Sequence, residues 1–332
     1  MRSFFHSAMP ELAVDPNTLL SMYEMMLKIR KFEEKIADVY SQQEMRCPTH
    51  LSIGQEAVAV GVCAALRNDD YVFSTHRCHA HYLAKGGDPR RMIAELYGKR
   101  TGCTKGKGGS MHLTDESVCM MGTSAIVGSS IPIAVGAALA SAMQGTERIA
   151  VAFFGDAAVE QGVFHESLNF AALKRLPVLF VCENNLYATN AHLSKRQPID
   201  NIFKHGEVYG ILGQRLDGND LLEIHLAACQ AVTKCRSGTG PILLECRTYR
   251  WREHVGPNYD YDLGYRTKQE LETWMEKCPV ERWKNQLLLA KIATVSELEL
   301  MSSKIDAEIE SAFALAKADP FPSDSELFDS VY

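Results

Sequence analysis

The pattern of apolar and polar positions divides the chain into short buried strands and longer helical stretches. Two continuous apolar runs, 149–154 and 178–182, are typical of strands buried on both faces of a parallel sheet. A helical stretch over 159–175 lies between them, so the three segments make one strand–helix–strand crossover of roughly 30 residues. Similar runs at 71–74 and 242–249 predict further strands. We therefore expect an α/β fold with a mostly parallel sheet and helices on both faces.

Helical spacing of apolar residues extends this pattern to both ends of the chain. Asp88 followed by Pro89 is typical of a helix start, since Asp caps a helix and proline suits its first position. We expect a single domain over 1–332, with a helical N-terminal extension at about 17–66 and a helical C-terminal extension at about 268–332. The predicted helices are 17–43, 55–66, 88–97, 131–144, 268–276, 280–290 and 296–317.

Composition narrows the classes of function. The net charge of −6 and the pI near 6.0 argue against a nucleic-acid-binding surface. The longest apolar run, 131–143, is too short to span a bilayer and contains Pro132 and Gly136, so we expect no membrane segment. The ten cysteines show no C-x-x-C spacing and are read as reduced thiols. We expect a cytoplasmic protein.

Polar residues follow the two central strands where each strand ends. Gly155-Asp156 closes one apolar run, and Asn184-Asn185 closes the other. Because ligands of parallel sheets bind beyond the carboxyl ends of the strands, we expect Asp156 and Asn185 to lie side by side. A carboxylate and an amide oxygen suit Mg²⁺, which keeps further positions open for phosphate. The pattern predicts a site that holds a diphosphate through a metal.

The joint order of strand, Gly-Asp, helix, strand and Asn-Asn resembles the thiamine diphosphate-binding motif. Other segments, from about Leu20 to Tyr332, look like the alpha subunit of the thiamine diphosphate-dependent 2-oxo acid dehydrogenase component of the pyruvate/acetoin dehydrogenase type. They are Ile53-Gly54-Gln55-Glu56-Ala57, the stretch Ser-Thr-His-Arg-Cys-His at 74–79, the glycine-rich stretch 105–112, Ile126-Val127-Gly128 and Tyr265-Arg266-Thr267.

The resemblance implies roles for individual residues. For catalysis it implies His50, which would face the 2-oxo acid, His79, which would line the site, and His254 on a mobile loop that touches the diphosphate. For the metal it implies Asp156, Asn185 and Tyr187. For cofactor binding it implies His76, Arg77, Ala125, Val127, Gly155, Asp156, Ala157, Ala158, Asn185 and His254. The chain departs from the family at Ala157, at Val255 and in the loop 253–264. Ala157 stands where glycine is usual, and alanine there is strained if the backbone needs a positive φ.

Two rival readings concern the same segments. The three histidines His76, His79 and His81 could form a zinc cluster, but no further ligand set of suitable spacing accompanies them. The glycine-rich loop 105–109 could pass for a phosphate cradle, but it lacks the G-x-x-x-x-G-K-[ST] order. A lid or a subunit-contact loop is the better interpretation.

The resemblance also implies a partner and a reaction. The cofactor would decarboxylate a small 2-oxo acid, and the glutamate that activates it would come from a transketolase-like beta subunit in an α₂β₂ heterotetramer. The chain would then be inert alone. In the family, the acyl group passes to a lipoyl-bearing acyltransferase. Two alternatives stay open: a split transketolase-like or acyloin-forming enzyme that transfers the acyl carbanion to an aldehyde or sugar, and a non-catalytic cofactor-binding homologue.

Overall fold

A computed structural model describes residues 14–45 and 47–329 of the chain. The predicted domain bounds, 1–332, include residues 1–13, 46 and 330–332, which lie outside the described residues, and the single domain stays a prediction.

A six-stranded sheet forms the centre of the fold, and all of its neighbouring strands are parallel. The strand order is β2-β1-β3-β4-β8-β7. The carboxyl ends of β3 and β4 lie level, with Gly155 opposite Glu183. The predicted parallel α/β fold is confirmed. The strands are β1 (Tyr71–Thr75), β2 (Met120–Ser124), β3 (Ala150–Gly155), β4 (Val178–Asn184), β7 (Leu212–Asp217) and β8 (Ile242–Arg247), and a separate hairpin pairs β5 (Tyr187–Ala188) with β6 (Ala191–His192).

Helices surround the sheet, and each predicted helix is present with ends shifted by a few residues. Four elements of the main sheet and its cover were not predicted: β2, β7, α3 and α7. Asp88 caps α4 as expected, because its side chain accepts from the N–H of Arg90 and Pro89 follows at the first helical position. The helices are α1 (Pro16–Val39), α2 (Glu56–Cys63), α3 (His79–Ala84), α4 (Pro89–Leu96), α5 (Ser130–Met143), α6 (Gly162–Lys174), α7 (Leu221–Arg236), α8 (Lys268–Met275), α9 (Pro279–Leu289) and α10 (Val295–Ala318).

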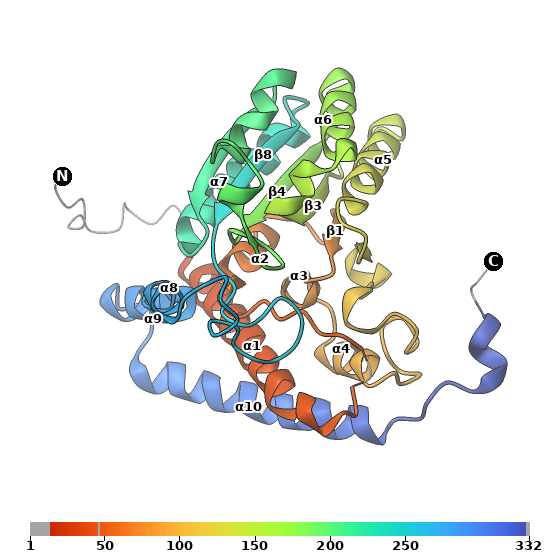
Figure 1. Cartoon of the computed structure of the whole chain (residues 1–332), viewed down its shortest axis with the longest axis vertical. Helices are drawn as coiled ribbons and strands as arrows, with labels where there is room; N and C mark the ends of the chain where they lie inside the picture. Colours follow the sequence, from red (N-terminus) through yellow and green to blue (C-terminus); the bar gives the residue numbers. More distant parts are fainter. Residues whose placement is uncertain (1–13, 46, 330–332) are drawn as a thin grey trace.

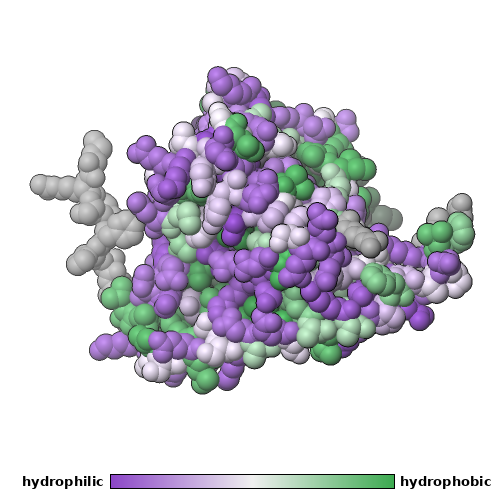
Figure 2. Space-filling view, turned by 60° about the horizontal axis from the view of Figure 1, so that its bottom comes forward, coloured by the Kyte–Doolittle hydropathy of each residue, from purple (hydrophilic) through white to green (hydrophobic). Residues whose placement is uncertain are grey.

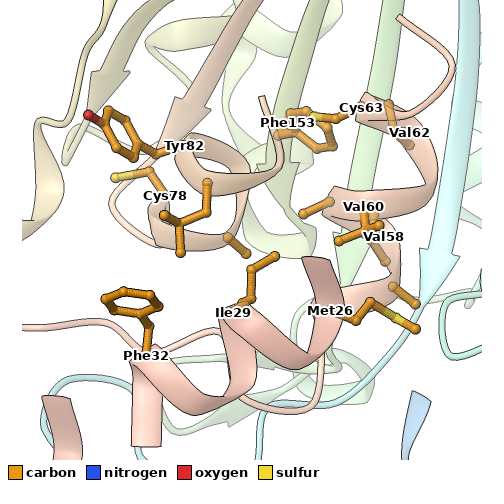
Figure 3. Close-up of a cluster of buried hydrophobic side chains, with 14 of the residues drawn as sticks. Met26, Ile29, Phe32, Val58, Val60, Val62, Cys63, Cys78, Tyr82 and Phe153 are labelled. Carbon is orange, nitrogen blue, oxygen red and sulfur yellow. The ribbon is translucent and has the colours of Figure 1, made fainter. Parts of the chain in front are cut away.

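Alternate side chains of the central strands enter two different apolar clusters. On β3, Ala152 and Phe154 face the cluster that contains residues of α5 and α6, whereas Val151 and Phe153 face the larger cluster with α1, α2 and α7. Figure 1 shows α5 and α6 beside the sheet, with α1 and α10 below it. In Figure 3, Phe153 lies near Cys63, and side chains of α1 and α2 gather beneath them. The sheet is buried on both faces, which explains the continuous apolar runs.

The two terminal extensions pack against each other. Helix α10 lies along α1, and lysines of α1 form ion pairs with carboxylates of α10. The pairs are Lys28–Glu308, Lys31–Asp306 and Lys35–Glu310. On the face shown in Figure 2, hydrophilic residues predominate and hydrophobic ones are scattered among them. None of the helices within the described ranges has the length and apolarity needed to cross a bilayer.

Candidate active site

A cavity of about 220 Å³ includes residues from the carboxyl ends of β3 and β4 in its lining. Ligands of parallel α/β sheets bind in this position. All the residues proposed from the sequence lie on its wall except His79. The lining consists of His50, Gln55, Thr75, His76, Arg77, Met111, Ala125, Val127, Gly128, Gly155, Asp156, Ala157, Ala158, Glu183, Asn185, Tyr187, Ala188, Thr189 and His254.

Asp156 directly follows β3 and begins a short 3-10 helix, η4 (Asp156–Glu160). Its side chain is buried and forms an ion pair with Arg196, which also pairs with Glu160. Burial raises the pKa of Asp156, and the Arg196 guanidinium opposes that shift. Arg196 therefore supplies an internal counter-charge at the carboxylate, a role that sequence analysis missed because the two residues lie on separate segments.

Asn185 follows β4 and lines the same cavity as Asp156. Its amide donates to Gln55 Oε1 over 2.9 Å, and its Oδ1 accepts from the N–H of Tyr187 over 3.2 Å. Leu186, between them, has a φ of 76°, a left-handed conformation that is unfavourable for leucine. Such strain persists where the surrounding structure holds it, often at functional sites. The turn after β4 is thus shaped to present Asn185 to the cavity.

Arg77 is the buried cation of the cavity. Only 4% of the residue is exposed, and it donates from Nη1 to the carbonyl of Leu51 and from Nη2 to the carbonyl of His254. Among residues 14–45 and 47–329 it forms no ion pair with a carboxylate. Burial, assisted by the nearby Arg250, lowers the pKa of Arg77 to about 10, so the side chain stays charged at neutral pH. A buried guanidinium in this state suits an anionic ligand.

Three histidines meet at the cavity although they come from distant segments. The ring centroids of His50 and His76 are 4.6 Å apart, and those of His254 lie 5.2 Å from His50 and 5.3 Å from His76. Burial, followed by the charge of Arg77, lowers the pKa of His50 to about 2, of His76 to about 4 and of His254 to about 3. All three rings are therefore neutral at physiological pH.

His79 does not line the cavity, contrary to the prediction. It is fully buried, with Nδ1 2.6 Å from Glu33 Oε1 and Nε2 2.7 Å from Ser110 Oγ. The other oxygen of Glu33 accepts from the N–H of Ser52, two residues from His50. His79 begins α3 and faces α1, so it links the segment near His50 to the glycine-rich loop instead of facing a substrate.

The glycine-rich loop is organised by one carboxylate. Glu95 is buried and accepts hydrogen bonds of 2.8 to 3.0 Å from four backbone N–H groups of the loop. The donors are Thr104, Gly106, Gly108 and Gly109. These N–H groups already bind an anion from within the protein, so the loop does not act as a phosphate cradle.

An ionic cluster fixes the segment that carries His254. Asp260 is buried between Arg250 and Arg266, and Arg250 Nη1 lies 2.9 Å from Asp260 Oδ2. Arg266 also donates from Nη1 to the carbonyl of Arg250 over 2.8 Å. These contacts tie together the two ends of the polar, irregular stretch 250–266, which carries His254 to the cavity. Elsewhere on the wall, Ala157 does not have a positive φ, so alanine fits the backbone there without that strain.

The fold and the site define a parallel α/β protein with a ligand cavity at the strand ends, where a buried cation and oxygen donors face the same space. The chain belongs to the Dehydrogenase E1 component family, whose model matches residues 23–325. This confirms the resemblance found in the motifs, together with the oxidoreductase class and the use of thiamine diphosphate that characterise the family.

Relatives of known name agree with this assignment. The chain is 41% identical over 326 residues to the alpha subunit of acetoin:2,6-dichlorophenolindophenol oxidoreductase of Bacillus subtilis, covering 97% of this chain and 95% of that protein. It is 39% identical over 313 residues to the pyruvate dehydrogenase E1 component subunit alpha of Rhizobium meliloti, covering 94% and 89%. It is 39% identical over 319 residues to the chloroplastic pyruvate dehydrogenase E1 component subunit alpha-3 of Arabidopsis thaliana, covering 94% and 74%.

Proposed function

We propose that this chain is the alpha subunit of a decarboxylating 2-oxo acid dehydrogenase of the pyruvate or acetoin type, and that its cavity binds the diphosphate half of thiamine diphosphate through Mg²⁺. The observation that carries the proposal is Arg77, a buried cation on the cavity wall with no carboxylate partner in the described residues. A bound diphosphate supplies the missing negative charge.

Other polar atoms of the wall support the fit. His50 Nδ1 and Gln55 Nε2 are buried and have no hydrogen-bond partner in the described part of the chain. Unpaired buried polar atoms cost free energy unless a ligand or water satisfies them. Both atoms belong to cavity-lining residues, so a polar ligand in the cavity is their natural partner.

For the metal, Asp156 and the Asn185 amide oxygen would supply the hard oxygen ligands that Mg²⁺ prefers. The phenol of Tyr187 donates to Glu270 over 3.0 Å, so Tyr187 would contribute its main-chain oxygen instead. Bound Mg²⁺ would neutralise Asp156 in place of the Arg196 guanidinium.

Thiamine diphosphate, when bound, provides the nucleophilic carbon that adds to the keto group of a 2-oxo acid and the ring that accepts electrons after carbon dioxide is lost. The chain's own residues bind and orient around that chemistry. Arg77 would bind the negatively charged diphosphate, His76 and His254 would flank it as neutral hydrogen-bonding groups, and His50 would hydrogen-bond the substrate. Backbone groups of Ala125 and Val127 would hold the aminopyrimidine ring.

Exposed apolar residues at the rim of the cavity favour a partner subunit that completes the site. Ile126 is 73% exposed and Val127 is 45% exposed, and Val127 also lines the cavity. The proposed occupant of this rim is a transketolase-like beta subunit that supplies the activating glutamate, in an α₂β₂ assembly. A lipoyl-bearing acyltransferase is the proposed acceptor of the acyl group. The proposed location of the enzyme is the cytoplasm.

Co-expression with the beta subunit tests the function. The assembly is expected to oxidise pyruvate or acetoin with 2,6-dichlorophenolindophenol as electron acceptor, and to acylate a lipoyl domain reductively, whereas the chain alone does neither. Carbon–carbon bond formation with an aldehyde acceptor, without lipoyl acylation, would instead support the acyloin-forming alternative. Absence of any turnover in the assembly, with no binding of the cofactor, would overturn the proposal.

A further inference from the structure

We propose that His50, His76 and His254 form a binding site for a divalent transition metal of the zinc type in the cofactor-free chain. One nitrogen from each ring can be chosen so that all three lie within 4.8 Å of one another. The three residues come from the segment before α2, the loop after β1 and the segment 250–266. The sequence spacing of histidines gives no hint of this set.

The other closely spaced histidines are directed elsewhere. His79 contacts Glu33 and Ser110, and His81 Nδ1 lies 2.9 Å from Ser74 Oγ. The zinc cluster weighed from the sequence, His76 with His79 and His81, is therefore not formed. The fold instead brings His76 to two histidines that are distant along the chain.

The chemical state of the rings suits a metal. A metal binds neutral imidazole, and burial together with Arg77 keeps the pKa of each ring well below neutral pH. Three histidine nitrogens with an open fourth position are a recognised zinc arrangement. Tetrahedral coordination needs nitrogens about 3.3 Å apart, so the rings must move inward by about 1 Å. His76 and His254 are only partly buried, whereas His50 is buried.

Nearby charges modulate the site. Arg77 repels a cation, whereas Glu183, on the same wall, attracts one. An open fourth position can hold chloride or hydroxide, whose negative charge would offset the repulsion by Arg77. The site differs in type from the Asp156 and Asn185 pair, because oxygen donors favour Mg²⁺ and imidazole favours zinc.

The proposed metal site overlaps the proposed cofactor site. His76 and His254 cannot bind the metal and the diphosphate at the same time, so a bound zinc ion should exclude thiamine diphosphate. This competition rests on the proposed function, whereas zinc binding itself does not.

The primary test is a calorimetric titration of the full-length, chelator-treated chain with Zn²⁺, repeated with Co²⁺ to read tetrahedral coordination from its visible absorption. The chain is expected to bind one equivalent at this cluster. His76→Tyr should weaken binding by more than about tenfold. His165→Asn is the matched control, since His165 forms a separate pair with His205 at a ring distance of 5.6 Å, and it should leave the affinity unchanged.

Thermal unfolding without metal checks that each variant is folded, and His254→Gln replaces His76→Tyr if the latter does not fold. The proposal is overturned by absence of stoichiometric binding, by equal affinity in the wild type and the folded cluster variants, or by loss of binding in His165→Asn alone.

A second titration uses the chain assembled with its beta subunit and adds thiamine diphosphate with Mg²⁺ before Zn²⁺, which should lower the apparent zinc affinity. If zinc binds at the cluster but the cofactor does not bind at all, the proposed function fails and the metal site stands.

Discussion

The glycine-rich loop and the cavity each contain a buried charged side chain, but only the charge in the loop is neutralised within the part of the chain that the structure describes. In the glycine-rich loop, the Glu95 carboxylate accepts hydrogen bonds from four backbone N–H groups, which stabilise its negative charge. In the cavity, the Arg77 guanidinium donates only to carbonyls and has no carboxylate partner among the described residues. The first region looks like an anion site in sequence and is structural; the second shows no glycine-rich signature and suits an anion.

Whether a buried charge is neutralised within the chain distinguishes a structural element from a binding site better than the residue types do. A carboxylate surrounded by donors stabilises the fold, because removing it leaves those donors unpaired. A buried cation without a counter-charge costs stability and is retained where a ligand neutralises it.

Glu95→Gln should lower the free energy of unfolding by about 3 kcal/mol. The amide oxygen of glutamine can accept hydrogen bonds but its NH₂ group cannot, so some N–H groups of the loop lose their partner. Urea denaturation measures the change. Glu272→Gln, at a largely exposed position, is the control and should change stability by less than about 0.5 kcal/mol. A similar small effect in both variants would show that Glu95 is not structural.

Arg77→Met should have a large effect on cofactor affinity and a small effect on the free energy of unfolding. Loss of a charged hydrogen-bond donor should weaken binding of thiamine diphosphate with Mg²⁺ by about 10- to 100-fold. The free energy of unfolding should change by no more than about 1 kcal/mol, since the desolvated charge disappears together with two bonds to carbonyls. Calorimetry and urea denaturation of the same preparation give both numbers. A large loss of stability with unchanged affinity would contradict the distinction between the two regions.

The neutral state of His50 predicts a pH dependence. Its folded pKa is lowered to about 2, below the ordinary value of 6.5, so on acidification the unfolded chain takes up a proton that the folded chain does not. Its contribution to stability is present above pH 6.5 and is lost as the pH falls through the acidic range toward the folded pKa. Between pH 6.5 and 5.5 the loss should be about 1 kcal/mol. Urea denaturation of His50→Gln at both pH values should show a correspondingly flatter dependence, and an unchanged dependence would refute the assignment.

Arg196→Gln should have the smallest effect. Arg196 forms an ion pair with Asp156, the proposed Mg²⁺ ligand. Asp156 therefore resembles Glu95 in having a partner within the chain and resembles Arg77 in lining the cavity. Without the guanidinium, Mg²⁺ no longer competes with it, and the affinity for Mg²⁺ in the presence of thiamine diphosphate should rise about two- to fivefold. Arg175→Gln serves as the control, because Arg175 lies at the C-terminal end of α6. A marked fall in affinity would show that Arg196 holds the ligand itself.

Much of the fold was readable from the sequence because the central strands are buried on both faces. Strands β3 and β4 show continuous apolar runs, and their ends place Asp156 and Asn185 at one cavity. Strands β2 and β7 are edge strands with partly exposed side chains and therefore lack such runs. Helix α7 did carry a signal, with Asp220 as its cap and apolar residues at helical spacing.

The site was readable where a motif is contiguous and unreadable where partners are distant. Arg77, Asp156 and Asn185 stand in recognisable segments. The contact between Gln55 and Asn185 joins positions 130 residues apart, and no local pattern reveals it. The family resemblance implies a site role for His79, but the residue lies at the start of α3 and faces α1. Side-chain direction on a short helix is set by packing that the sequence alone does not display.

The most direct test of the cavity as a diphosphate and metal site is calorimetric titration of thiamine diphosphate, with and without Mg²⁺, into the chain assembled with its beta subunit. Wild-type protein should bind the cofactor only when Mg²⁺ is present, and Asp156→Asn should lose this binding while retaining its assembly and thermal stability. Binding that is independent of Mg²⁺, or that persists unchanged in Asp156→Asn, would contradict the account.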